Sequence, residues 1–412
     1  TSCILHPRRR RLEANAVVGE SMPVIEMVDV SLRRGRQQVL ENWNLSVDSG
    51  EVVVLSGENG CGKSSVIEAC SGLLPLETGS TTISKQLIRD SEGRRGRIAF
   101  GLCLQDDCIM GDEIVEERLL DVAECSFDTT SLLKKWKLEH RSKDRVAMLS
   151  GGQRRKLAVI SGVLPALLSS KPMAVLLDEP DSGLDDESVK ILAKLLTDLA
   201  AGGHSVLVAS HNQEIHSIAN RIVNFPFSIE KLNPPIGKFE SITGGKHVQR
   251  MVGHRINLRT MSLFANNGIA GLLVLGGMLA LLEPSTLDAK MRAGFILAPA
   301  LALGLCGDPL FRLLQENRAH AWWNASKGMT PNSLLHILIS AGLLTLLASA
   351  AINYYDWKLI AAGALFGFVT ATIVSWISHA TLRLARPNAL MLRLLTPIII
   401  LPWALIVDTL AV

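Results

Sequence analysis

The sequence predicts an α/β domain with a mostly parallel sheet, followed by an all-α transmembrane domain of about five helices. Two observations lead to this prediction. Short apolar segments alternate with helical patterns up to about residue 235, and long uncharged stretches recur after residue 259. The composition agrees, because 48% of the 412 residues are hydrophobic and only 20% are charged. A single soluble domain would carry about a quarter charged residues.

The overall composition also excludes several classes of protein. The chain is too apolar to be disordered and too long to be a small disulfide-stapled domain. A net charge of +3 provides no basic field that would favour nucleic acid as a partner. The seven cysteines form no CxxC pair, which favours free, mostly buried thiols over a metal site.

The predicted α/β domain covers residues 22–235. Residues 24–30 alternate apolar and polar side chains, as a half-buried strand does. Residues 51–56, 173–177 and 205–209 are short apolar runs typical of buried parallel strands, and a helical pattern over 188–201 separates the last two. We expect residues 1–21 to be a disordered leader. A proline- and glycine-rich segment then introduces a linker over 236–259.

The first chemical motif follows the strand at 51–56. It has the pattern GxxxxGK[ST] of a phosphate-binding loop, with a strand before it and a helical pattern after it. Glycines allow backbone N–H groups to surround phosphates, and the helix N-terminus adds positive potential. We expect Lys63 to reach the β- and γ-phosphates of ATP, and the Ser64 hydroxyl to bind Mg²⁺. The predicted nucleotide-binding residues here are Gly57, Glu58, Asn59, Gly60, Cys61, Gly62, Lys63, Ser64 and Ser65.

A second motif lies at the end of the strand predicted over 173–177. Asp178 and Glu179 follow this strand directly, before Pro180. An apolar strand that ends in an acid supplies the second Mg²⁺-binding element of such ATPases, so Asp178 is a predicted metal-binding residue. Glu179 is the predicted general base for the attacking water.

A third motif, Leu149-Ser150-Gly151-Gly152-Gln153, makes the sequence resemble the ABC ATPases. The resemblance implies ATP hydrolysis and a dimer, in which Ser150, Gly151, Gly152 and Gln153 of one protomer close over ATP bound by its partner. Three further residues match family motifs in the right order. By resemblance, Gln105 is a catalytic and Mg²⁺-sensing glutamine that also contacts the membrane part, Asp185 belongs to the D-loop, and His211 contacts the γ-phosphate.

The chain departs from the family pattern at the adenine. The family stacks an aromatic ring there, whereas the corresponding segment here, residues 32–36, holds none. The Arg34 guanidinium could stack in its place, and a solvated surface arginine is the equal alternative. The preference for ATP over GTP therefore stays open.

The apolar stretches cover residues 260–282, 293–307, 328–355, 359–382 and 394–407. Ten Lys and Arg residues lie in the loops on the ATPase side and three lie on the other side, as the positive-inside rule requires. Trp322, Trp323, Tyr354, Tyr355 and Trp357 are expected at membrane interfaces. The amphipathic loop 308–330 is predicted either to dock on the ATPase near Gln105 or to lie on the membrane as an interfacial helix.

The compact ATPase, with an Arg-Gly stretch ahead of Val39 and Leu40, resembles the A subunit of the haem-exporter pair of cytochrome c maturation. The membrane part is similar to the B subunit of that pair, on segments 307–312, 327–331 and 383–386. The B subunit has six spans, whereas five are predicted here. This resemblance implies haem export or ATP-driven release of a haem chaperone.

Three functional hypotheses remain after these observations. The first is an ATP-hydrolysing transporter with a fused permease in the cell membrane, working as a homodimer or with a separate permease subunit. The second is an exporter of another amphipathic substrate, such as a lipid or a drug. The third is a membrane-anchored mechanical ATPase that translocates nothing.

Overall fold

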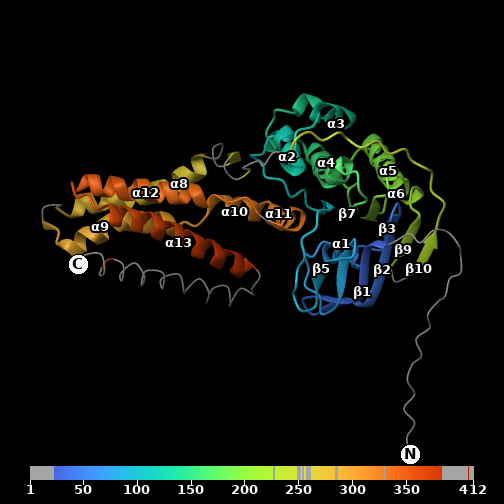
Figure 1. Ribbon diagram of the computed structural model, residues 1–412, viewed down its shortest axis with the longest axis horizontal. Coiled ribbons are helices and arrows are strands. Elements are labelled where there is room, and N and C mark those ends of the chain that lie inside the picture. The colour runs from blue at the N-terminus through green and yellow to red at the C-terminus, as the bar shows by residue number, and fades with distance from the viewer. Residues whose placement is uncertain are drawn as a thin grey trace, which may run out of the picture.

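The computed structural model describes residues 23–225, 228–247, 252, 255–256, 261–283, 286–328, 330–382 and 407. Figure 1 shows an α/β domain and an elongated helical part, which meet at two short helices labelled α10 and α11. The predicted leader and nearly all of the fifth apolar stretch lie outside the described residues.

The centre of the α/β domain is a six-stranded sheet of order β10-β9-β3-β8-β7-β6, parallel except at β10. Its strands β3, β7 and β8 are the three short apolar runs predicted from the sequence, and they lack polar alternation because helices cover both faces of the sheet. The strands are β3 (Val52–Ser56), β6 (Gly101–Cys103), β7 (Ala174–Asp178), β8 (Ser205–Ala209), β9 (Arg221–Asn224) and β10 (Ser228–Lys231).

A second sheet in this domain was not anticipated. The predicted strand over 24–30 is the middle of β1 (Pro23–Arg34), but it joins an antiparallel sheet of order β2-β1-β4-β5. The other strands are β2 (Gln37–Asp48), β4 (Thr78–Ile83) and β5 (Gln86–Asp90). The expectation of one mostly parallel sheet was therefore incomplete. β1 pairs with the adjacent β2 across a short turn, and it also pairs with β4 about 50 residues away, a separation beyond any local pattern.

The helices of the α/β domain are α1 (Lys63–Cys70), α2 (Val115–Ala123), α3 (Thr129–Lys135), α4 (Gly151–Leu168), α5 (Asp186–Ala201) and α6 (Gln213–Ser217). Two 3₁₀ turns, Glu139–Arg141 and Val146–Met148, connect α3 to α4. The predicted helix over 188–201 corresponds to α5. Asp185 caps its N-terminus by accepting a hydrogen bond from Ser188 N at 2.9 Å.

The helical part contains α8 (Met261–Leu281), α9 (Ala289–Leu305), α12 (Leu334–Ala351) and α13 (Trp357–Leu382). Three described helical segments are long and apolar enough to cross a membrane: Ala289–Glu316, Leu334–Ala351 and Trp357–Ser378. A shorter apolar helix, Asn267–Leu281, adds to them. By length and composition, these helices suit an all-helical membrane domain.

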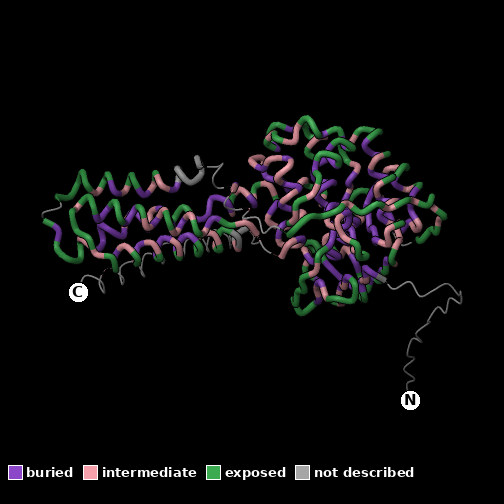
Figure 2. The backbone as a smooth tube through the Cα atoms, turned by 45° about the horizontal axis from the view of Figure 1, so that its top comes forward, coloured by how far each residue is buried: buried purple, intermediate pink, exposed green. Residues whose placement is uncertain are grey.

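Many residues on the outside of this bundle are exposed (Figure 2), and large apolar side chains are among them. On α12, Leu335, Ile339, Leu343 and Leu346 recur at helical spacing and are 43–55% exposed. Contact between such an apolar stripe and water is unfavourable, whereas contact with lipid chains is not. Large exposed apolar patches of this kind mark protein or membrane contacts. The outer face of α12 is therefore suited to lipid.

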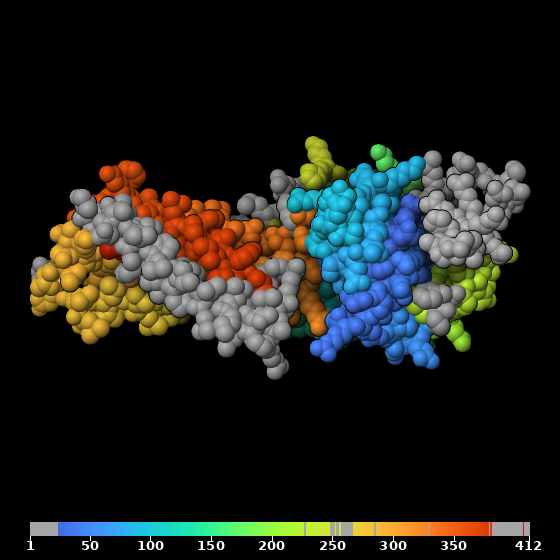
Figure 3. Space-filling view, turned by 90° about the horizontal axis from the view of Figure 1, so that it is seen from below, coloured from blue at the N-terminus to red at the C-terminus, as the bar shows by residue number. Residues whose placement is uncertain are grey.

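Two short helices, α10 (Pro309–Glu316) and α11 (Ala319–Lys327), connect the bundle to the α/β domain. In Figure 3 their residues, drawn in orange, lie directly against the cyan and blue residues of that domain. Arg318 Nη1 lies 2.5 Å from Asp106 Oδ2, Lys327 Nζ donates to Val122 O at 2.6 Å, and Trp322 Nε1 donates to Leu102 O at 2.8 Å. The prediction that this loop docks on the ATPase near Gln105 is confirmed.

The same contacts correct one expectation. Trp322 and Trp323 are each 3% exposed and do not lie at a membrane interface. Their rings instead flank the buried guanidinium of Arg118, with its Cζ 4.1 Å and 5.1 Å from the two ring centroids. Glu113 completes this cluster with an ion pair to Arg118 at 3.2 Å. A buried cation–π cluster of this kind favours burying both indoles within the protein over placing them among lipid headgroups.

Candidate functional site

The residues of the predicted phosphate loop connect β3 to α1 at the carboxyl edge of the six-stranded sheet. This edge is where open α/β sheets bind ligands. Gly57 and Gly62 have φ angles of 141° and 117°, a region that favours glycine. A Cβ at Gly57 would lie 2.9 Å from Phe225 Cβ, and one at Gly62 would lie 2.8 Å from Val39 Cγ1. Both glycines are therefore required by the close packing of the loop.

Lys63 is held over this loop. Its side chain is only 4% exposed, and its Nζ donates to the carbonyl oxygens of Gly57 at 2.7 Å and Glu58 at 2.9 Å. Lys63 also begins α1, so its ammonium lies near the positive end of that helix. An anionic phosphate group is the natural ligand of such a site.

Ser64 and Asp178 come together from different elements. Ser64 Oγ donates to Asp178 Oδ1 at 3.0 Å, which joins the start of α1 to the end of β7. A hydroxyl oxygen beside a carboxylate oxygen is a donor pair suited to Mg²⁺, which prefers oxygen ligands and retains phosphate and water oxygens. These residues fit the metal, and Ser64 and Asp178 would hold it. When bound, Mg²⁺ would neutralise charge on the phosphates of ATP.

Asp178 is almost fully buried, and this burial raises the pKa of its carboxyl from 3.8 to about 6. The hydrogen bond from Ser64 lowers this pKa and the nearby Glu179 raises it, but both effects are smaller than burial. Because the pKa in the folded state is above that in the unfolded state, this group lowers stability as the pH rises from about 4 to about 6.

The Asp178→Asn variant should therefore unfold at a higher temperature than the wild type at pH 7.5, without nucleotide. The neutral amide removes the cost of a buried charge, worth about 3 kcal/mol for a shift of this size. The gain should shrink at pH 5, where the native carboxyl is protonated. Thermal unfolding at both pH values, with the exposed Asp186→Asn as control, checks this. An equal gain at both pH values would contradict it.

Glu179 and Gln105 face each other at the same edge. Gln105 Nε2 donates to Glu179 Oε2 at 3.3 Å. Glu179 adopts φ = 44°, unusual for a residue other than glycine, and such strained backbones occur at functional sites. Its N–H donates to Ala209 O at the end of β8 at 2.9 Å. A carboxylate placed beside a loop for phosphates can accept a proton from water.

These groups line one cleft of about 720 Å³. The α/β domain contributes Lys63, Ser64, Gln105 and Glu179 to its walls. The segment from α10 to α11 contributes Gln315, Arg318, His320, Ala321 and Asn324. The cleft thus lies where the two parts of the chain meet.

Arg34 also lines this cleft. Its Nη2 lies 2.5 Å from Glu68 Oε2 on α1. The guanidinium is therefore beside the loop and held by an ion pair, which is compatible with stacking on a nucleotide base.

Other sequence-predicted residues do not line this cleft. Ser150 caps α4 and forms a reciprocal pair of hydrogen bonds with Gln153. Gly151 and Gly152 form the first turn of the same helix. His211 follows β8 and is exposed. Asp185 accepts a hydrogen bond from Ser188 and forms an ion pair with Lys156 at 3.2 Å. The hydrogen bond from Ser188 is the main reason that the pKa of the Asp185 carboxyl falls to about 2.

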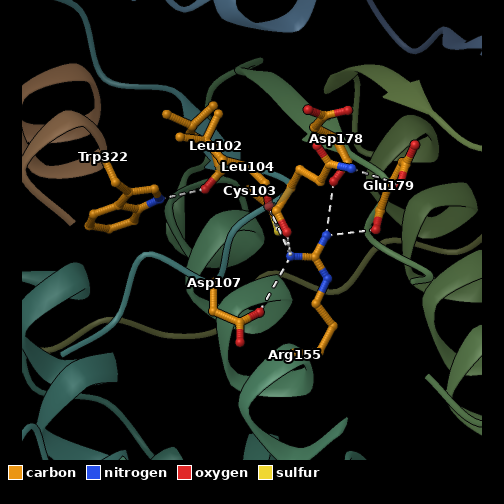
Figure 4. Close-up of polar contacts among 9 residues, drawn as sticks. Leu102, Cys103, Leu104, Asp107, Arg155, Asp178, Glu179 and Trp322 are labelled. Atoms are coloured by element: carbon orange, nitrogen blue, oxygen red, sulfur yellow. Dashed lines mark hydrogen bonds and ion pairs between the residues drawn. The ribbon is translucent and has the colours of Figure 1, made fainter. Parts of the chain in front are cut away.

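Arg155 is a residue of this region that the sequence did not single out. It is 4% exposed and forms hydrogen bonds with four backbone carbonyls around the site (Figure 4). Its neighbour Arg154 is exposed. Helical spacing does not distinguish the two arginines, because apolar residues follow both at three and four positions.

Comparisons with known proteins agree with this geometry. Residues 40–182 match the family described as "ABC transporter". A putative ABC transporter ATP-binding protein of Streptomyces avermitilis is 31% identical over 229 residues, covering 53% of this chain and 39% of that protein. The glutamate/aspartate import ATP-binding protein GltL of Escherichia coli K12 is 29% identical over 212 residues, covering 48% of this chain and 86% of its own length.

A third relative carries a permease in its name. The macrolide export ATP-binding/permease protein MacB of Acinetobacter baylyi is 29% identical over 198 residues, covering 45% of this chain and 29% of MacB. The chain thus spans less than two-fifths of the length of the first and third of these relatives.

Proposed function

We propose that this chain, which contains an ABC transporter ATPase domain, hydrolyses ATP to drive transport by the membrane helices fused to it. The observation that carries the proposal is the docking of α11 beside Gln105. Trp322 donates to Leu102 O and Arg318 pairs with Asp106, so both neighbours of the Gln105 segment contact the helical part. A change at the nucleotide cleft therefore has a direct mechanical connection to the proposed permease.

The proposed catalytic arrangement assigns one task to each group. Lys63 and the amides of the 57–65 loop bind the phosphates of ATP, and Ser64 and Asp178 hold the position for Mg²⁺. Glu179 accepts the proton of the attacking water, while Gln105 keeps the Glu179 carboxylate in place through the bond of 3.3 Å. His211 follows β8, the strand that lies between β3 and β7 in the sheet, and we assign it to the γ-phosphate.

The proposed active unit is a homodimer. The start of α4 offers the Ser150 hydroxyl and the backbone amides of Gly151 and Gly152, but it does not line the cleft of its own chain. Such an end suits a phosphate that a second copy presents. In this proposal ATP binding closes the two ATPase domains, and hydrolysis lets them separate.

For the cargo, we propose haem or a haem chaperone, with function in cytochrome c biogenesis. This rests on the resemblance of both parts of the sequence to the haem-exporter pair. A second candidate is another amphipathic substrate, since one relative is named for macrolide export and another, from Sinorhizobium fredii, for Nod factor export. A third candidate is a mechanical ATPase that moves nothing across the membrane.

The test compares membranes of the host carrying wild-type protein with those carrying Glu179→Gln. A haem-stained gel should show loss of covalent c-type cytochromes in the variant, while other haem proteins remain. Normal c-type cytochromes would exclude the haem role. Purified protein in liposomes then separates the other two candidates: uptake of a lipid or drug with ATP supports an exporter, and substrate-stimulated hydrolysis without uptake supports a mechanical ATPase.

A further inference from the structure

Arg155 connects two segments that carry groups of the proposed active site. Its Nη1 donates to Leu104 O at 2.9 Å and Gln105 O at 3.1 Å, and its Nη2 donates to Asp178 O at 2.9 Å and Glu179 O at 2.6 Å. Asp107 adds an ion pair to Nη1 at 3.5 Å. A planar guanidinium fixes the directions of its donors, so these carbonyls are held in one relative position.

The held backbone is strained at Glu179. This residue has φ = 44° and precedes Pro180, although a residue before proline favours extended backbone. A strained conformation persists only where its surroundings enforce it. The short bond from Arg155 to the Glu179 carbonyl is one such constraint, and the bond from Glu179 N to Ala209 O is another.

The segment 102–105, which Arg155 contacts at Leu104 and Gln105, also forms a hydrogen bond with α11. Leu102 lies in β6, which is the edge strand of the six-stranded sheet and leads directly into Leu104 and Gln105. An edge strand presents carbonyl groups that no further strand pairs. The indole of Trp322 in α11 donates to one of them, Leu102 O, at 2.8 Å (Figure 4).

We infer that Trp322 and Arg155 are positioning residues for ATP hydrolysis, which together link helix α11 to the carboxylate of Glu179. Trp322 fixes the position of β6 relative to α11. Arg155 fixes the two residues that follow β6, Leu104 and Gln105, relative to Glu179. A movement of α10 and α11 would thus change how Gln105 and Glu179 face each other. The inference rests on the proposed function, because it concerns the rate of the proposed hydrolysis.

The chain offers matched controls for both residues. Trp323 is as buried as Trp322 and also contacts Arg118, but its Nε1 has no hydrogen-bond partner among the described residues. Trp323→Phe therefore removes an indole without removing a hydrogen bond to β6. Arg154→Lys is the control for Arg155→Lys, since Arg154 is the exposed neighbour on the same helix.

The experiment measures kcat and KM for ATP with the full chain in lipid nanodiscs. Trp322→Phe should lower kcat about 3-fold with unchanged KM, which is the size of one lost hydrogen bond. Arg155→Lys should lower kcat about 10-fold or more, because a lysine cannot hold both pairs of carbonyls. Trp323→Phe and Arg154→Lys should retain wild-type values.

A double-mutant cycle tests the link between the two residues. If Trp322 acts through Arg155, the Trp322→Phe, Arg155→Lys variant should be no slower than Arg155→Lys alone. If the two effects multiply to about 30-fold, the residues act independently and the inference is overturned. Equal rates for Trp322→Phe and Trp323→Phe would also overturn it. If Arg155→Lys fails to fold, Asp107→Asn replaces it, since this change removes only the ion pair to the guanidinium.

The wild-type protein separates this inference from the proposed function. Wild type that neither binds nor hydrolyses ATP would refute the proposed function and the inference with it. Active wild type with unaffected Trp322→Phe would refute the inference alone.

Discussion

The Lys63→Ala variant is expected to lose ATP binding, with affinity reduced at least about 100-fold. The lost group is a buried ammonium held over the phosphate loop by two backbone carbonyls, where a charge-assisted hydrogen bond to phosphate is strongest. Titration with a fluorescent ATP analogue measures the effect. The matched control is Lys137→Ala, which removes an exposed lysine from an ion pair with Glu187. Unchanged hydrolysis by Lys63→Ala would refute the assignment of the site.

The Glu179→Gln variant is expected to bind ATP normally but to hydrolyse it about 10²–10⁴-fold more slowly, the usual contribution of a general base. The amide oxygen of glutamine can still accept the bond from Gln105, so the geometry of the site is retained while its basicity is lost. Since closure requires only binding, the variant should accumulate as a dimer that retains ATP.

Single-turnover hydrolysis and the amount of radiolabelled ATP retained after size-exclusion chromatography measure these two properties. Glu187→Gln, which neutralises an exposed carboxylate on α5, is the control and should behave as wild type. Rapid hydrolysis by Glu179→Gln would show that another group is the base. Retention of ATP by a monomer alone would contradict the proposed composite site.

The residues of the proposed nucleotide site could be named from the sequence because each motif is local. A glycine loop between a buried strand and a helix, an acid pair directly after a strand, and a Ser-Gly-Gly-Gln helix start all occupy contiguous positions. Their backbone requirements act over a few residues, as the φ angles of Gly57 and Gly62 show. The contact of Ser64 with Asp178, 114 positions apart, then follows because α1 begins and β7 ends at the same edge of the parallel sheet.

The amphipathic pattern of the loop 308–330 is consistent with two binding surfaces for its apolar face, the ATPase and the membrane. Periodicity shows that a helix has an apolar face but does not show what covers it. In the structure, Arg118 and Glu113 form a buried pair against Trp322 and Trp323. This desolvated cation is what makes the ATPase the better environment for the two indoles.

The sequence by itself determined the strand–loop–helix order, the phosphate loop, the acid pair and the apolar segments of this protein. Only the tertiary structure decided that Arg155 rather than Arg154 holds the backbone of the proposed active site, that β1 joins a separate antiparallel sheet, and that Trp322 binds β6. The physical reason is the range of the interactions. Backbone conformation and hydrophobic period are set by neighbouring residues, whereas the partner of a buried guanidinium, a strand edge or an indole N–H depends on packing between segments far apart in the chain.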